Sequence, residues 1–204
     1  MKLYFAPMAC SLAPHIILRE LGRSFELIRV NNQTKRTAEG GSFLDINSKG
    51  YVAALTLDNG ETLTEGPAIL QYLADLQPEA GLAPANGSWQ RIRLQEMLNF
   101  IATELHSGSA PLFRADLPET VRQIFREKLF KRLDWLETRL ETQPYLLGHD
   151  FGVADAYLFA ILGWLPRFDI ALARWPTLDA FFQTVAARPA ARAALLAEDS
   201  SAPV

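Results

Sequence analysis

Residues Ala9-Cys10-Ser11-Leu12-Ala13-Pro14-His15 decide the fold that this sequence predicts. They follow a short apolar run, Leu3-Tyr4-Phe5, and precede a helical pattern that ends at Gly22, a residue type common just beyond a helix C-terminus. Pro14 fits the first turn of that helix, because the N–H that proline lacks would have no partner there. The sequence therefore predicts a strand, a turn that carries Cys10, and a helix.

Cys10 is the only cysteine of the chain. At a strand-to-helix turn, unpaired backbone N–H groups and the helix dipole favour a thiolate, so this position predicts an acidic, nucleophilic thiol. The alternative is a small buried apolar side chain, which is the commoner role of a lone cysteine. Because one cysteine cannot form an internal disulfide, we expect any disulfide at Cys10 to be made with another molecule.

The composition is that of an ordinary globular protein. The chain has 204 residues, of which 49% are hydrophobic and 21% charged, enough to bury a core in one large or two small domains. A formal net charge of -3 provides no basic face for nucleic acid. The sequence shows neither a signal peptide nor an apolar segment of membrane-spanning length. We therefore expect a cytoplasmic protein that binds neither nucleic acid nor membrane.

Residues 1–77 predict a small α/β domain. Residues 31–50 form a long polar loop with at most a helical turn at Phe43-Leu44, and a second helix begins at Pro67. The predicted order is βαβ followed by ββα, which is typical of a thioredoxin-like domain. The segments expected to form strands after the first are Phe25–Val30, Val52–Leu57 and Glu61–Leu63.

Residues 78–87 are interrupted by proline and glycine and predict a linker, with Leu82 as its anchor. Residues 88–204 then predict an all-helical domain. Residues 155–162 are apolar on nearly all sides, as in a helix at a domain centre, and we expect the tail from Glu198 to fray. Two apolar stripes at helical spacing support the domain: Leu94, Met97, Leu98, Ile101 and Leu105, then Val121, Phe125, Leu129, Leu133, Leu136 and Leu140.

A series of short motifs occurs in a characteristic order along nearly the whole chain. In that order and at these intervals the motifs resemble those of the cytosolic glutathione transferases, and within them the bacterial beta class. The resemblance implies a thioredoxin-like N-terminal domain, an all-helical C-terminal domain and a homodimer. The motifs are Cys10–His15, Lys35 with Thr37 and Gly40-Gly41, Asn47–Val52, Glu65–Leu73, Arg93–Glu96, Glu104–His106, Pro111–Phe113, Tyr145–Gly148 and Ala154–Tyr157.

The resemblance also implies a site for the tripeptide glutathione as cosubstrate. The main chain of Val52 would pair with the cysteinyl backbone of the tripeptide. Glu65 would accept from the γ-glutamyl ammonium, and the N–H of Gly66 at a helix start suits the adjacent carboxylate. Lys35 would meet the glycine carboxylate. Without the resemblance, Lys35 is a solvated loop charge and Glu65 a helix N-terminal carboxylate.

By the same resemblance, Cys10 and His106 would flank the sulfur of glutathione, with Ser11 as a second hydrogen-bond donor. Asn99 and Glu104 would reach across the dimer toward the γ-glutamyl end. No metal is implied. Without the resemblance, His106 is interpreted as a histidine on a helix face with no functional role. His15 and His149 are interpreted in the same way. Core and interface packing is the role expected of the tryptophans Trp89, Trp135, Trp164 and Trp175.

Four positions depart from the family pattern. Ala53 stands where the family has a proline after a cis peptide bond, and whether the Val52-Ala53 bond is cis decides how Val52 faces the tripeptide. Ser48 replaces another proline, and Ser107 replaces a lysine near the site. Gly152 replaces the Ser or Thr that caps the buried helix, at an expected cost of a few tenths of a kcal/mol, roughly, with Asp155 able to reach back.

The leading hypothesis is a glutathione transferase in which Cys10 forms a mixed disulfide with glutathione or hydrogen-bonds its thiolate. Small hydrophobic electrophiles, or disulfides, would bind in the interdomain cleft, lined from residues 105–113. One alternative is a transferase-like binding or regulatory protein with weak or no turnover, motivated by Ala53 and Ser107. Another is a glutaredoxin-like thiol-disulfide reductase.

Overall fold

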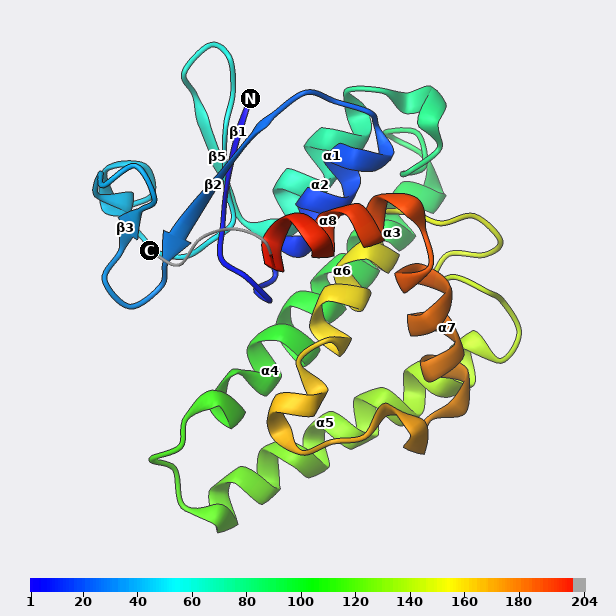
Figure 1. Ribbon diagram of the computed structural model, residues 1–204. Helices are drawn as coiled ribbons and strands as arrows, with labels where there is room; N and C mark the ends of the chain where they lie inside the picture. The colour runs from blue at the N-terminus through cyan, green and yellow to red at the C-terminus, as the bar shows by residue number, and fades with distance from the viewer. Residues whose placement is uncertain (200–204) are drawn as a thin grey trace.

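A five-stranded sheet forms the first domain of the computed structural model, which describes residues 1–199 (Figure 1). The sheet order is β3-β2-β1-β4-β5, with β1 parallel to β2 and the other neighbours antiparallel. This arrangement confirms the predicted order and adds β3, which is too short to leave a periodic signal in the polar loop. The strands are β1 (Lys2–Phe5), β2 (Glu26–Asn31), β3 (Arg36–Thr37), β4 (Ala54–Thr56) and β5 (Thr62–Thr64).

Two helices pack on one face of this sheet, and the more buried of them is α1 (Leu12–Glu20). Every residue from Leu12 to Leu18 is buried, because α1 lies between α2 (Gly66–Asp75) and helices of the second domain. The loop between β2 and β4 contains the expected short turn, η1 (Phe43–Asp45). The first domain therefore presents α1, and the turn before it, to the rest of the chain.

The second domain is helical throughout, as expected. All ten residues of α6 are buried, so the prediction of a central helix is confirmed. The helix after the linker does not stay α-helical, because it widens into a π-helical segment at Ile101. The helical elements are η2 (Pro78–Ala80), α3 (Trp89–Phe100), η3 (Ile101–His106), α4 (Ser107–Ser109), η4 (Ala110–Phe113), α5 (Glu119–Leu140), α6 (Val153–Leu162), η5 (Leu165–Phe168), η6 (Leu172–Arg174), α7 (Pro176–Ala186) and α8 (Pro189–Asp199). No helix among residues 1–199 is long and apolar enough to cross a membrane.

Several hydrogen bonds hold the segment between the domains in place. The Arg91 guanidinium is buried and donates to Asp75 Oδ1 at 2.9 Å and to the Pro84 carbonyl at 2.8 Å. Leu82 is buried, and its carbonyl accepts from the Val153 N–H at 3.0 Å. The connection from α2 to α3 thus packs on the start of α6 and holds the two domains together.

Gly152, the residue before α6, lies close to the backbone of Leu82, which leaves little room for a side chain. Asp155 reaches back as expected, with Oδ2 accepting from the Gly152 N–H at 2.9 Å, while Oδ1 accepts from the Leu146 N–H at 2.8 Å. A Cβ on Gly152 would lie 2.8 Å from the carbonyl oxygen of Leu82. The glycine is therefore a steric requirement of this backbone and not a cap weakened by a few tenths of a kcal/mol, which corrects that expectation.

The C-terminal helix α8 packs against α1 (Figure 1). Glu198 is buried with Oε1 2.9 Å from Nδ1 of His15, and Arg19 Nε donates to His15 Nε2 at 2.9 Å. The prediction that the chain frays from Glu198 is therefore wrong for residues 198 and 199, and residues 200–204 lie outside the described part of the chain. His15 joins the two helices, so its interpretation as a histidine without a role is also wrong.

Candidate functional site

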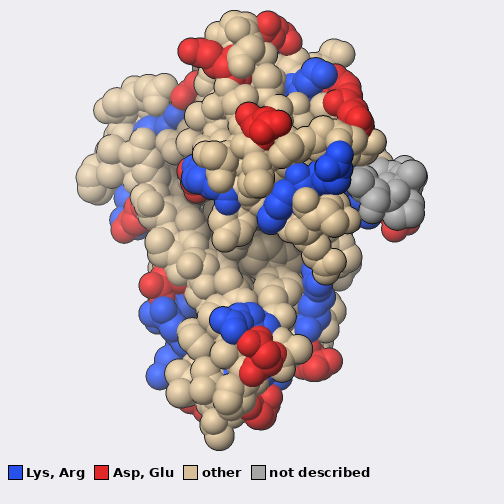
Figure 2. Space-filling model, turned by 90° about the vertical axis from the view of Figure 1, so that its left-hand side faces the viewer, with Lys and Arg blue, Asp and Glu red and all other residues tan. Residues whose placement is uncertain are grey.

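A cleft between the two domains holds two adjoining cavities, and Figure 2 shows this face hollowed between its upper and lower halves. The larger cavity has a volume of about 810 Å³ and the smaller about 380 Å³. Four residues line both cavities: Cys10, Tyr51, Val52 and His106. Further residues of the larger cavity include Lys49, Glu65, Gly66, Gln71, Asn99 and Tyr157, and those of the smaller include Met8, Lys35, Phe113, Trp164 and Arg167.

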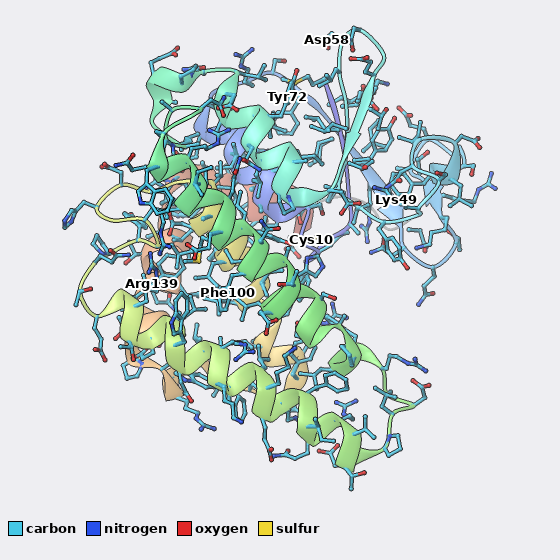
Figure 3. All side chains as sticks on the ribbon, turned by 180° about the vertical axis from the view of Figure 1, so that it is seen from behind. Cys10, Lys49, Asp58, Tyr72, Phe100 and Arg139 are labelled. Atoms are coloured by element: carbon cyan, nitrogen blue, oxygen red, sulfur yellow. The ribbon has the colours of Figure 1, made fainter. Side chains whose placement is uncertain are left out.

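Cys10 lies just before α1, where the two domains meet (Figure 3). Its side chain is partly buried, and Sγ lies 3.5 Å from the Val52 carbonyl oxygen, to which the thiol donates. Burial raises the pKa of Cys10 to about 11, although the backbone N–H groups of Cys10, Ala53 and Ser11 oppose the shift. The prediction of an acidic thiol is therefore wrong for this structure, because desolvation of the thiolate outweighs the turn's N–H donors.

The backbone before β4 brings Val52 to the cleft. The Val52-Ala53 peptide bond is cis, as in the family pattern, although Ala53 replaces the proline. Asn47 is buried and donates from Nδ2 to the Tyr51 carbonyl at 2.7 Å, which fixes the chain just before Val52. The main chain of Val52 therefore lies at the wall that both cavities share.

His106 reaches the cleft from the end of the π-helical segment η3. Such segments occur often at functional sites, because the wider turn redirects the side chains that follow it. Nδ1 of His106 lies 2.7 Å from the hydroxyl of Tyr157 on α6. Burial lowers the pKa of His106, which keeps the imidazole neutral at neutral pH, although Glu65 opposes this shift.

Tyr157 is a cavity residue that the sequence analysis missed. It is 2% exposed, and burial raises the pKa of its hydroxyl, so the phenol stays protonated. A signal for it exists in the sequence, because a tyrosine within a helix that is otherwise apolar on all sides needs a hydrogen-bond partner for its hydroxyl. The sequence does not identify that partner, which lies 51 positions away.

Glu65 and Gly66 meet the larger cavity at the start of α2. Glu65 has φ of 71°, which is uncommon for a residue other than glycine and is typical of backbone held for function. Its Oε1 is ion-paired with Nζ of Lys49, which also donates to Thr64 Oγ1 at 2.8 Å. Lys49 is therefore a second cavity residue that the sequence patterns did not predict, because it stands in a polar loop without a periodic signal.

Lys35 lies at the smaller cavity, on the loop between β2 and β3. Its Nζ donates to the Gly50 carbonyl at 2.8 Å and lies 5.4 Å from the centroid of the Tyr51 ring. Among residues 1–199, four non-glycine residues have positive φ, and three of them line the cleft: Met8, Lys35 and Glu65. Unusual backbone is therefore concentrated at this site.

Other predicted site residues lie differently. The Ser11 hydroxyl is buried and bonds the backbone of Ala6, accepting from N at 3.2 Å and donating to O at 3.3 Å, so it does not face either cavity. Glu104 accepts from Arg132 Nε at 2.7 Å, and this hydrogen bond lowers the pKa of the carboxyl. Asn99 lines the larger cavity, and its amide donates to the Gln95 carbonyl at 2.9 Å.

Two further expectations concern tryptophans and metals. Trp164 is buried as expected, but it also lines the smaller cavity, where its Nε1 donates to the Met8 carbonyl at 2.8 Å, so packing is not its whole role. Trp89, in contrast, is 69% exposed. Within residues 1–199 the structure brings together no group of three or more His, Cys, Asp or Glu side chains that could hold a metal ion.

Comparison with known proteins follows the same two-domain division. The family model for the glutathione S-transferase N-terminal domain matches residues 1–75, and that for the glutathione S-transferase C-terminal domain matches residues 100–189. Glutathione S-transferase GstA of Escherichia coli O157:H7 is 44% identical over 198 residues, covering 97% of this chain and 98% of that protein. Glutathione S-transferase GST-4.5 of Xanthomonas campestris pv. campestris is 35% identical over 205 residues, with 97% and 98% covered.

Solved structures agree with these relatives. The ternary complex of BphK, a bacterial glutathione S-transferase, superimposes with a TM-score of 0.96 at 50% identity, covering 98% of this chain and 100% of that one. A sphingomonad glutathione S-transferase complexed with glutathione gives a TM-score of 0.95 at 45% identity, with 98% and 100% covered.

Proposed function

The chain belongs to the glutathione S-transferase family, and on that premise we propose that it transfers the thiolate of glutathione to small hydrophobic electrophiles in the interdomain cleft. The observation that carries the proposal is the convergence of Cys10, Val52, Glu65 and His106 on one cavity of about 810 Å³. Glutathione is the proposed cosubstrate.

The polar groups of the cleft complement an extended tripeptide with a charged group at each end. At the γ-glutamyl end, Glu65 suits the ammonium, while Lys49 and the Gly66 N–H suit the carboxylate. The main chain of Val52 offers pairing to the cysteinyl residue between the ends. Lys35 suits the glycine carboxylate because its ammonium is positively charged. Its Nζ lies beside the ring of Tyr51, a residue that lines both cavities.

At the sulfur, the proposed role of Cys10 is that of a hydrogen-bond donor. With a pKa of about 11 the thiol stays protonated at neutral pH, so its single S–H can turn from the Val52 carbonyl oxygen to the glutathione thiolate and donate to it without forming a disulfide. The glutathione thiol loses its proton to the solvent, and the thiolate forms a C–S bond with the electrophile as the leaving group departs with its bonding electrons. His106 is proposed as a second donor, since Tyr157 can donate to Nδ1 and so leave the proton on Nε2.

The proposed assembly and location come from the family. We propose a homodimer in which Asn99 and Glu104 extend toward the γ-glutamyl end of glutathione in the partner subunit. The proposed location is the cytoplasm, where the glutathione system keeps thiols reduced. The proposed boundaries are a glutathione-binding domain of residues 1–77, a linker of residues 78–87 and a helical domain of residues 88–204.

The test is conjugation of 1-chloro-2,4-dinitrobenzene, combined with retention on immobilised glutathione. We expect wild-type protein to conjugate this electrophile, and Glu65→Gln to lower kcat/KM for glutathione by about tenfold or more, because a neutral amide loses a charge-assisted hydrogen bond. Glu61→Gln is the matched control, since Glu61 is exposed in the β4–β5 hairpin and outside both cavities. Absence of both conjugation and retention would reject the proposal.

Intact mass after incubation with oxidised glutathione separates the two roles of Cys10. A neutral, partly buried thiol should acquire little mixed disulfide at pH 7. Rapid addition of one glutathione, absent in Cys10→Ala, would instead support the reductase alternative. Retention on glutathione without conjugation would support the binding or regulatory alternative.

A further inference from the structure

The smaller cavity is lined by positive but not by negative side chains. Lys35 and Arg167 belong to its lining, and no Asp or Glu is found among the described residues that form it. The larger cavity differs, because Glu65 and Lys49 lie there as an ion pair. Figure 2 shows Lys and Arg side chains on both sides of the hollow between the halves of the molecule. The smaller cavity therefore favours an anion.

Arg167 is placed at this cavity by the short helical turn η5. The next residue, Phe168, is buried and packs against Phe113 with ring centroids 4.7 Å apart, which anchors the turn. The Arg167 guanidinium lies over the Phe113 ring, 4.9 Å from its centroid, a cation–π arrangement. Within residues 1–199 no carboxylate pairs with this guanidinium, so its planar array of N–H donors is available to a ligand.

Aromatic side chains surround the same space. The rings of Phe113 and Trp164 have centroids 5.2 Å apart at an interplanar angle of 75°, and Trp164 also lies 4.9 Å from the His106 ring. A planar aromatic ligand can pack against these faces. The smaller cavity thus combines an aromatic wall with the Arg167 guanidinium, which no carboxylate of the described residues neutralises.

We propose that the electrophile of this enzyme is an aromatic acid, whose carboxylate pairs with Arg167 while its ring packs on Phe113 and Trp164. A neutral ligand covering Arg167 would desolvate the guanidinium without compensation, whereas a carboxylate gains two charge-assisted hydrogen bonds. Lys35 is committed to the glycine carboxylate in the proposed function, so Arg167 is the cation left for the second substrate. This inference rests on the proposed transferase function.

A suitable probe is 4-chloro-3-nitrobenzoate, with 4-chloro-3-nitrobenzamide as its neutral counterpart. The glutathione thiolate attacks the ring carbon that carries chlorine, a C–S bond forms, the C–Cl bond breaks, and chloride leaves with the bonding electrons. The proton of the glutathione thiol passes to the buffer, and nothing is oxidised or reduced. Each enzymatic rate is divided by the uncatalysed rate with glutathione, so that the intrinsic reactivity of acid and amide cancels.

For the wild-type enzyme we expect the corrected kcat/KM to favour the acid over the amide by about tenfold or more, and the preference to shrink with added salt. Arg167→Gln should reduce the preference by about tenfold, mostly through KM for the acid. Arg174→Gln is the matched control, because Arg174 also lies over aromatic rings, at 4.4 Å from Phe130, but does not line either cavity. It should retain the preference.

The outcomes separate this inference from the proposal on which it rests. Conjugation of the amide without a preference for the acid, or a preference unchanged in Arg167→Gln, overturns the aromatic-acid inference and leaves the transferase function standing. Conjugation of neither compound, nor of 1-chloro-2,4-dinitrobenzene, overturns both.

Discussion

The hydroxyl of Tyr157 on α6 and Nδ1 of His106 at the end of η3 lie 2.7 Å apart beneath the interdomain cleft. The two rings meet nearly edge to face, with an interplanar angle of 80°. Because the phenol stays protonated and the imidazole neutral, the hydroxyl can orient the ring and select its tautomer. The central helix of the second domain thereby acts on the proposed sulfur site through His106.

Tyr157→Phe tests this positioning role. We expect kcat/KM with 1-chloro-2,4-dinitrobenzene to fall about tenfold, because Nδ1 loses the partner that fixes the imidazole. The acidic limb of the pH profile should also move, since removing the hydroxyl changes the environment in which His106 titrates. The measurements are steady-state kinetics from pH 5.5 to 8.5, together with urea unfolding at fixed protein concentration.

Tyr72→Phe is the matched control for that variant, because Tyr72 lies on α2 and outside both cavities (Figure 3). It should leave kinetics unchanged. If Tyr157→Phe loses stability but keeps both kcat/KM and the pH profile of wild type, Tyr157 is a packing residue only.

The raised pKa of Cys10 predicts slow alkylation at neutral pH. Only the thiolate reacts, so with a folded-state pKa of about 11 the rate constant for iodoacetamide should rise about tenfold per pH unit from pH 7.5 to 9.5 without levelling. Cys10 is the only cysteine, so intact mass reports this site alone. The same chain unfolded in urea is the control, and its rate should level near the ordinary thiol pKa. A plateau below pH 8.5 in the folded protein would contradict the assignment.

Gly152→Ser should destabilise the protein even though serine is a good helix N-cap. Its Cβ would lie 2.8 Å from the Leu82 carbonyl oxygen, a backbone atom that also accepts from Val153, so the chain around it must shift. We expect a loss of about 1 to 3 kcal/mol in the free energy of unfolding. Urea denaturation at one protein concentration measures it.

Gly41→Ser serves as the control in that experiment, since a Cβ there meets only the Thr37 side chain at 3.5 Å. Its effect should stay within about 0.5 kcal/mol of wild type. A Gly152→Ser protein as stable as wild type, or more stable, would show that capping outweighs the close approach of Leu82.

Local patterns in the sequence predict the elements of this fold well, because periodicity and turn chemistry depend on neighbouring residues. The helix after Cys10, the hairpin before Glu65 and the buried helix that contains Tyr157 all follow from such patterns. The pKa of Cys10 does not follow from such patterns. It depends on the burial of the thiol, to which segments of both domains contribute.

Pairings between distant segments are equally invisible to local patterns. The Lys49 to Glu65 ion pair and the contact of Glu198 with His15 each join residues that a single sequence does not relate. Glu198 stands in a stretch whose composition is that of a frayed tail, and its contact with His15 on α1 makes it part of the interior.

Because α8 packs on α1, the packing around α1 cannot be completed until α8 has been synthesised. Because α1 precedes α8 in the sequence, the part of α1 that α8 covers stays exposed until residues 189–199 have been translated. During that interval the nascent first domain exposes apolar surface that chaperones recognise. Helix α8, far from α1 in the sequence, is therefore the element that completes the packing around the first helix of the first domain.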